Sequence, residues 1–138
     1  MVIFGLFRKS KSKNEIRCKK GRGNTFEIAG AGNYQAELLR LAGGRKREYG
    51  VRIDEQATLS PEPSNPHDPD AVAVFIRKMK VGYLRKNDAP TFGAFLKEAG
   101  ADRASCSARI VGGWDDGEGN EGHFGVKLSL SWPPKIAI

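Results

Sequence analysis

Short apolar stretches recur along residues 24–132, and glycine, proline or acidic residues separate them. Alternation of apolar and polar residues over four to eight positions is typical of a half-buried β-strand, because successive side chains point to opposite faces of a sheet. On this criterion we predict strands over 25–29, over 49–53 with 57–59, and over 72–76, 81–84, 104–111 and 124–132. The strand over 72–76 is apolar on both faces, which favours a central position.

Two segments have the spacing of an amphipathic helix instead. The first, residues 34–42, follows Asn33, a residue suited to an N-cap, and ends at Gly43. The second, residues 88–99, carries apolar residues on one face and ends at Gly100. The predicted order is therefore strand, helix, two or three strands, helix, two strands.

This order predicts the fold class. No two strands are joined by a helix in the regular manner of a parallel sheet. Six or so short strands with two helices in this length favour a mainly β domain, namely a small antiparallel OB-like or SH3-like barrel over residues 24–132. Residues 133–138 are expected to form a C-terminal tail.

The positive charge is concentrated before this domain. Residues 1–23 hold eight basic residues and one acidic residue, which accounts for the whole net charge of +7. The segment lacks a helical or strand period, so we predict a basic, mostly disordered arm that attracts polyphosphates. Two alternatives remain open, a solubilising tail and an arm that contacts anionic membranes through Phe4, Leu6 and Phe7.

Composition narrows the location. The apolar start precedes its positive charges, whereas a secretory signal has the charges first, so export is not expected. No apolar run approaches the roughly 20 residues that span a bilayer. Cys18 and Cys106 are too few for a disulfide framework and are expected to stay reduced. We therefore predict a cytoplasmic protein without a membrane partner.

Candidate chemistry for an enzyme is sparse. His67 and Asp68 are sequence neighbours with no serine or cysteine placed as their nucleophile, and the cysteines and histidines lack zinc-ligand spacing. No glycine-rich loop carries the Lys-Ser/Thr pair that binds nucleotide phosphates. The acidic loop 115–121 can in principle chelate a cation, but its composition is typical of an exposed, mobile loop. We predict no enzymatic activity, no cofactor and no metal.

Two motifs carry a resemblance to a known family. Residues 63–74 read Pro-Ser-Asn-Pro-His-Asp-Pro-Asp-Ala-Val-Ala-Val, and residues 81–84 read Val-Gly-Tyr-Leu before the second predicted helix. Together with Gly-Ala-Gly-Asn-Tyr at residues 30–34, they closely resemble the HIRAN domain over about residues 24–132. Its signature is Asn-Pro, an aromatic residue or His, Asp, then Ala-Ile or Ala-Val, and later Gly-Tyr-Leu or Gly-His-Leu. The chain is similar to the stand-alone bacterial members, and the family's best-understood member binds the 3′ end of single-stranded DNA.

The resemblance implies roles for particular residues. Asp68 matches the carboxylate that contacts a terminal 3′-hydroxyl, and a carboxylate suits a free hydroxyl because it only accepts hydrogen bonds. His67, Tyr83 and Trp114 match positions that stack on bases, and Lys86 matches a phosphate contact. The complete set of implied binding residues is Asn33, Tyr34, His67, Asp68, Tyr83, Arg85, Lys86 and Trp114.

One departure from the family concerns the first turn. The DNA-binding relative carries a basic residue followed by aromatics where this chain has Gly32, Asn33 and Tyr34. One stacking ring and one phosphate contact are therefore missing or moved. Affinity and preference for a strand end are the properties that this difference affects.

Structural roles compete with these binding roles. Asn65, Asp68 and Asp70 can serve only to cap turns between prolines, and Tyr83 and Trp114 can be core residues with bonded polar atoms. The leading hypothesis is a single-stranded DNA-binding module, with RNA still possible and a DNA-processing protein as a further partner. The alternative is an adaptor whose groove takes a peptide, and metal-dependent phosphoester hydrolysis is a distant third.

Overall fold

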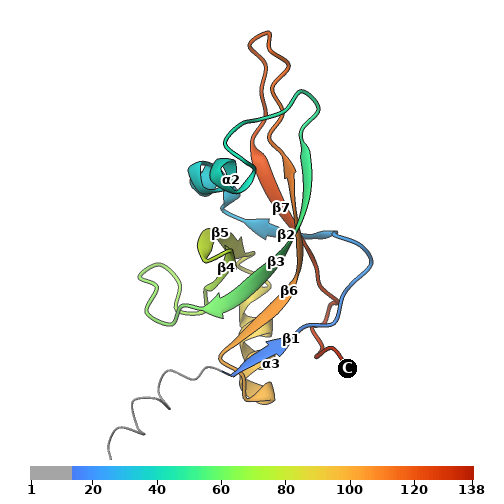
Figure 1. The fold of residues 1–138 in the computed structure, drawn as a ribbon. Helices are drawn as coiled ribbons and strands as arrows, with labels where there is room; N and C mark the ends of the chain where they lie inside the picture. The colour runs from blue at the N-terminus through green and yellow to red at the C-terminus, as the bar shows by residue number, and fades with distance from the viewer. Residues whose placement is uncertain (1–13) are drawn as a thin grey trace, which may run out of the picture.

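The computed structural model describes residues 14–138. Figure 1 shows a strand-rich molecule with two α-helices and one 3-10 turn in this part of the chain. Its elements in chain order are β1 (Glu15–Arg17), β2 (Phe26–Ala29), η1 (Ala31–Tyr34), α2 (Gln35–Leu41), β3 (Val51–Pro61), β4 (Val72–Ile76), β5 (Met79–Leu84), α3 (Ala89–Ala99), β6 (Arg103–Gly112) and β7 (Phe124–Ser129).

Six of the strands close into an antiparallel barrel. They follow the order β6-β3-β4-β5-β2-β7, and pairing of β6 with β7 completes the circle. β1 lies outside this circle, parallel to β6. The prediction of a small, mainly β, OB-like barrel with two short helices is confirmed. Strand β3 is continuous across 54–56, between the predicted segments 49–53 and 57–59, because every residue from Val51 to Leu59 pairs with β6.

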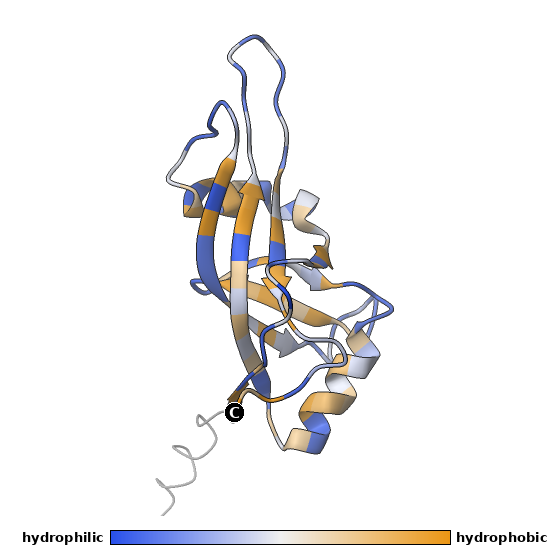
Figure 2. Ribbon diagram, turned by 90° about the vertical axis from the view of Figure 1, so that its right-hand side faces the viewer, coloured by the Kyte–Doolittle hydropathy of each residue, from blue (hydrophilic) through white to orange (hydrophobic). Residues whose placement is uncertain are grey.

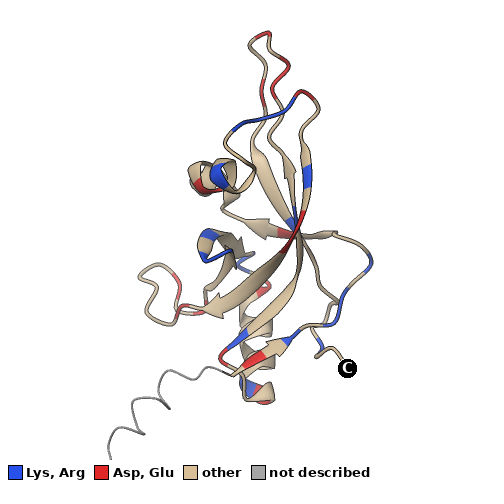
Figure 3. Cartoon of the chain, viewed as in Figure 1, with Lys and Arg blue, Asp and Glu red and all other residues tan. Residues whose placement is uncertain are grey.

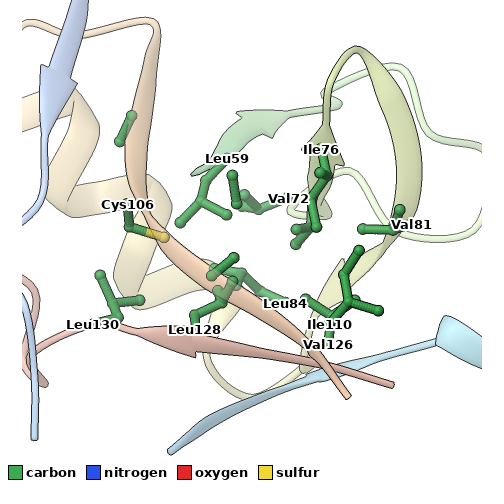
Figure 4. Close-up of a cluster of buried hydrophobic side chains, with 14 of the residues drawn as sticks. Leu59, Val72, Ile76, Val81, Leu84, Cys106, Ile110, Val126, Leu128 and Leu130 are labelled. Atoms are coloured by element: carbon green, nitrogen blue, oxygen red, sulfur yellow. The ribbon is translucent and has the colours of Figure 1, made fainter. Parts of the chain in front are cut away.

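Alternate apolar side chains of the strands fill the barrel. Leu59, Val74, Ile110 and Leu128 are fully buried, and Phe92 of α3 packs against the same core. Figure 4 shows several of these side chains converging from different strands. Figure 2 shows the hydrophobic positions concentrated in the strands and α3, and the connecting loops largely hydrophilic.

The segment after residue 13 belongs to the fold, which corrects the predicted arm. Cys18 is buried, the Lys19 amide donates to the Lys135 carbonyl at 2.8 Å, and the Ala137 amide donates to the Arg17 carbonyl at 2.8 Å. The folded region thus begins before the boundary expected at Asn24, and the C-terminal tail 133–138 is paired with it. Backbone pairing orders this segment, and its alternation over four residues was too short to be recognised. The prediction of disorder for residues 1–13 lies outside the described residues.

The first helix begins differently from the prediction. Asn33 lies inside η1, and α2 begins after Tyr34 without a side-chain cap. Gln35 instead fixes this junction, because its Nε2 donates to the Ala31 carbonyl and its Oε1 accepts the Phe124 amide at 2.8 Å. The predicted N-cap role of Asn33 is wrong, because Gln35 connects η1 directly to β7.

The hairpin of β4 and β5 contains an irregularity that matters for the site. Its register shifts between Val74 and Phe75, which face Gly82 and Lys80, so Val81 is an extra residue. In a regular strand Lys80 and Tyr83 would point to opposite faces, but one extra residue brings them to the same face. Gly82 is required here, because a Cβ atom would lie 2.7 Å from the Ala29 carbonyl oxygen of β2.

No helix within residues 14–138 has the length and apolar character that crossing a bilayer requires.

Candidate nucleic-acid interface

A hydrogen-bonded network on β5 forms the centre of the candidate site. Lys80 Nζ donates to Glu62 Oε2 and, at 3.0 Å, to the Tyr83 hydroxyl, which in turn donates to Glu62 Oε1 at 2.9 Å. The ammonium also lies 5.0 Å from the centre of the Tyr83 ring. The ring of Tyr83 is therefore held at a fixed angle on the outside of the barrel. We call Tyr34, Glu62, Asn65, Lys80 and Tyr83 the Tyr83 cluster.

The network shifts the titration of its members. Burial would raise the pKa of Glu62, but hydrogen bonds from Lys80, Asn65 and Tyr83 outweigh it and hold the pKa of this carboxyl below its usual range. Hydrogen bonds to Glu62 and Tyr83 raise the pKa of Lys80. The pair is thus charged at neutral pH, and Lys80 is already neutralised by Glu62.

Asn65 joins the cluster to the proline-rich turn. Its Nδ2 donates to Glu62 Oε1 at 3.0 Å, while its Oδ1 accepts the amides of His67 at 2.8 Å and Asp68 at 3.1 Å. Asp68 Oδ1 accepts the Asp70 amide at 2.9 Å. The capping roles expected for Asn65 and Asp68 are confirmed. That of Asp70 is not, because Asp70 takes part in the turn through its backbone amide and not through its carboxylate. Asp68 Oδ2 accepts no hydrogen bond from any described residue, and the side chain is half-buried.

Tyr34 completes the cluster from the neighbouring turn. Burial, followed by a side-chain hydrogen bond with Tyr83, raises the pKa of the Tyr34 phenol. The two rings that the sequence places 49 positions apart thus meet on one surface, because η1 follows directly after β2, whose Ala29 is the register partner of Tyr83. Asn33 is exposed beside them, and His67 is exposed on the turn.

The two basic residues after Tyr83 have different surroundings. Arg85 donates to Asp88 Oδ2 at 3.1 Å, and its guanidinium lies 5.8 Å from the centre of the Phe26 ring. Lys86 is exposed and forms no ion pair within residues 14–138. Lys86 is therefore the freer of the two for a phosphate contact.

Trp114 lies on a different part of the molecule. It belongs to the β6–β7 extension (residues 113–123), which projects from the barrel in another direction than the proline-rich turn (Figure 1). Its carbonyl accepts the Gly122 amide across the extension at 2.9 Å, and the indole packs so closely on Gly122 that a Cβ there would lie 2.1 Å from Nε1. Trp114 forms no aromatic pair with Tyr34 or Tyr83 in the described chain. The structure thus brings Tyr34 and Tyr83 together without joining Trp114 to them.

The extension is acidic at its tip, as Figure 3 shows. Asp115, Asp116, Glu118 and Glu121 lie there, and Lys46 pairs with Glu121 at 2.7 Å. Hydrogen bonding from Asn120 holds the pKa of Asp116 below its usual range. Within the described chain no three histidine, cysteine or acidic side chains are grouped as a metal site would require.

Two open grooves lie elsewhere on the described surface, and neither contains Tyr34, Asp68 or Tyr83. One, of about 690 Å³, separates the proline-rich turn from α3 and is lined by Pro63, Pro69, Gly93 and Leu96 among others. The other, of about 900 Å³, crosses the outer face of β3 and β6. There Arg77 and Arg109 are neutralised by Glu55 and Asp54. The Tyr83 cluster therefore lies outside both of these grooves.

Sequence reasoning missed two members of the cluster and one aromatic. Neither Glu62 nor Lys80 is among the binding residues that the family resemblance implies. The register shift that turns Lys80 toward Tyr83 has no signal in the hydrophobic pattern. Trp132 was assigned to the last strand, but it lies beyond β7 and packs on Phe26 with ring centres 4.9 Å apart.

Comparisons with known proteins found no matching family model, no matching curated protein and no matching solved structure.

Proposed function

We propose that this protein is a nucleic-acid binding module without enzymatic activity that prefers single-stranded DNA with a free 3′ end. The observation that carries this proposal is the Tyr83 cluster. Two aromatic rings lie beside a turn whose Asp68 has an unpaired carboxylate oxygen. Aromatic rings stack on bases of any sequence, and a carboxylate accepts a hydrogen bond from a terminal hydroxyl.

The charge distribution supports an end-binding mode over binding along a strand. Lys80 is neutralised by Glu62, and Asp68 and Asp70 lie on the adjacent turn. A phosphate that continued the strand past the terminal sugar would meet these carboxylates and be repelled. The turn thus favours a strand that ends there, while Lys86 is placed to contact a phosphate further back along the strand.

The proposal includes a cytoplasmic location and a DNA-processing protein as a further partner. Cys18 and Cys106 are free thiols, which agrees with a cytoplasmic location because stable disulfides are rare in the cytosol. Burial raises the pKa of Cys106 to about 12, so this thiol is not activated as a nucleophile.

The preference for an end can be tested with a strand that has none. We expect the full chain to bind a fluorescent linear oligonucleotide and to be competed by unlabelled linear DNA. A circular single strand of the same composition should compete about tenfold less well, because it lacks the terminal hydroxyl. Equal competition by the circle would overturn the end-binding mode, and no binding of either DNA would overturn the nucleic-acid function.

A second candidate function is favoured by the 690 Å³ groove between the proline-rich turn and α3. Its apolar lining is suited to a short peptide, as an adaptor would require. Gly93 offers a direct test, because its Cβ position in α3 has no atom within 4 Å. Gly93→Leu should fill the groove without disturbing the fold. Loss of oligonucleotide binding in this variant would show that the groove, and not the Tyr83 cluster, holds the nucleic acid.

A further inference from the structure

Trp132 and its surroundings form a second aromatic surface next to the candidate site. Its indole is 39% exposed although it packs on Phe26. Arg85 lies over the other ring of the pair, 5.8 Å from the centre of Phe26. Because Arg85 is two residues beyond Tyr83, a continuous series of side chains connects the Tyr83 cluster to Trp132.

The ordered part of the basic arm runs beside this indole. The Lys19 carbonyl accepts the Ser131 amide at 3.0 Å, and the Lys19 amide donates to the Lys135 carbonyl at 2.8 Å. These two backbone bonds join Lys19 to residues that precede and follow Trp132 in the sequence. Lys20 and Arg22 follow on the same segment, are exposed, and form no ion pair with any described residue. The ordered basic segment is thus joined by backbone bonds to the residues around Trp132.

We propose that Trp132 is a stacking platform for a nucleotide on the 5′ side of the terminal one, with Arg85, Lys19 and Lys20 contacting the phosphates around it. This inference rests on the proposed function and extends its site. Arg85 relates the two surfaces, because it is two residues beyond Tyr83 in the chain and its guanidinium lies over the ring on which Trp132 packs.

The protein offers a spectroscopic test, because Trp114 and Trp132 are its only tryptophans. In the variant Trp114→Phe, emission comes from Trp132 alone. We expect an oligonucleotide of about eight thymidines to quench this emission, since a stacked base quenches indole, and one of about two thymidines to leave it unchanged. In Trp132→Leu, which keeps an apolar cover on Phe26, the longer oligonucleotide should leave the emission of Trp114 unchanged.

Affinity gives a second readout. Trp132→Leu should weaken binding of the longer oligonucleotide by about fivefold or more and leave the shorter one unaffected. Thermal unfolding of Trp132→Leu establishes that the variant is folded. If wild-type protein distinguishes strand ends but quenching and the length dependence are absent, the platform is wrong and the end-binding function stands. If no oligonucleotide binds to wild-type protein, the proposed function itself fails.

Discussion

The Tyr83 cluster and the β6–β7 extension both present aromatic residues at the surface, but their support differs. Tyr83 is tied to β3 through Glu62, to the proline-rich turn through Asn65 and to η1 through Tyr34. Trp114 is held by Gly122 within its own hairpin, and its neighbours Gly113 and Asp115 form backbone bonds to Arg47 in the loop before β3. A ring fixed by several elements loses little conformational freedom when a base stacks on it. We therefore expect Tyr83 to contribute more to binding than Trp114, although both rings lie at the surface.

The largest expected effect is a difference in oligonucleotide affinity between variants of Tyr83 and of Trp114. Tyr83→Ala should weaken oligonucleotide binding about 5- to 100-fold, because stacking on one base contributes roughly 1–3 kcal/mol. Trp114→Ala should change the affinity by less than about twofold. Fluorescence anisotropy of the full chain with one oligonucleotide measures both. Equal losses in the two variants would return Trp114 to the binding site that the family resemblance implies.

The ion pairs that support the two regions can be removed by a matched pair of variants. Lys80→Met leaves the half-buried Glu62 without its cation, and should lower the free energy of unfolding by about 1–2 kcal/mol. Lys46→Met, which removes the ion pair to Glu121 on the extension, should lower it by less than about 0.5 kcal/mol because Glu121 is exposed. Urea unfolding of both variants makes the comparison. Equal values would mean that the Lys80 network contributes no rigidity.

The network also predicts a dependence of stability on pH. The pKa of Glu62 is lowered in the folded protein from 4.5, so its contribution is fully present above about pH 4.5 and is lost as the pH falls through the folded value. The pKa of Lys80 is raised from 10.5, so its contribution is present below about pH 10.5 and is lost as the pH rises further.

The variant Glu62→Gln tests the predicted loss of stability at acidic pH. Thermal unfolding should show the variant less stable than the wild type at pH 7 and similar to it at about pH 3. The matched change Asp116→Asn on the extension should leave the curve almost unchanged, because Asp116 is fully exposed. A difference between wild type and Glu62→Gln that stays constant with pH would contradict the assigned titration.

The smallest expected effect concerns salt. Residues 1–13 and residues 14–23 carry net charges of +4 and +3, so deletion of residues 1–13 leaves β1 intact and removes about half of the excess. The slope of log affinity against log salt concentration should become shallower and remain negative. Substituting both Lys19 and Lys20 by alanine should flatten the slope by about one unit more. A slope unaffected by both changes would place the phosphate contacts on Lys86 and Arg85 alone.

Much of the barrel could be predicted from the sequence, because burial imposes a period on strands such as β6 and β7. The order of Glu15–Arg17 could not, since it depends on backbone pairing with β6 and on side-chain contacts with Arg103, Gln56 and Ser107. The same holds for the first helix, whose start depends on Gln35 reaching the distant Phe124. The local sequence pattern does not indicate contacts between residues so far apart in the chain.

Several residues of the candidate site could be predicted, but the hydrogen bonds and contacts that join them could not. Tyr34, Asp68 and Tyr83 came from the family resemblance, and the structure places Tyr34 and Tyr83 together. Lys80 came only from the structure, because an extra residue in β5 reverses the face on which it lies. The position of Trp132 depends likewise on how the chain returns past Lys19 after β7.

The central claim is that the Asp68 turn accepts a free 3′-hydroxyl, and one titration tests it most directly. Two oligonucleotides of identical sequence, one ending in a 3′-hydroxyl and one in a 3′-phosphate, are compared for binding to wild-type protein and to Asp68→Asn. We predict that the 3′-phosphate weakens binding to the wild type by about tenfold or more, because the phosphate removes the donor and places like charges together. Asp68→Asn should lose most of this discrimination, since its amide retains an acceptor without the charge. Equal binding of both oligonucleotides to the wild-type protein would contradict the account.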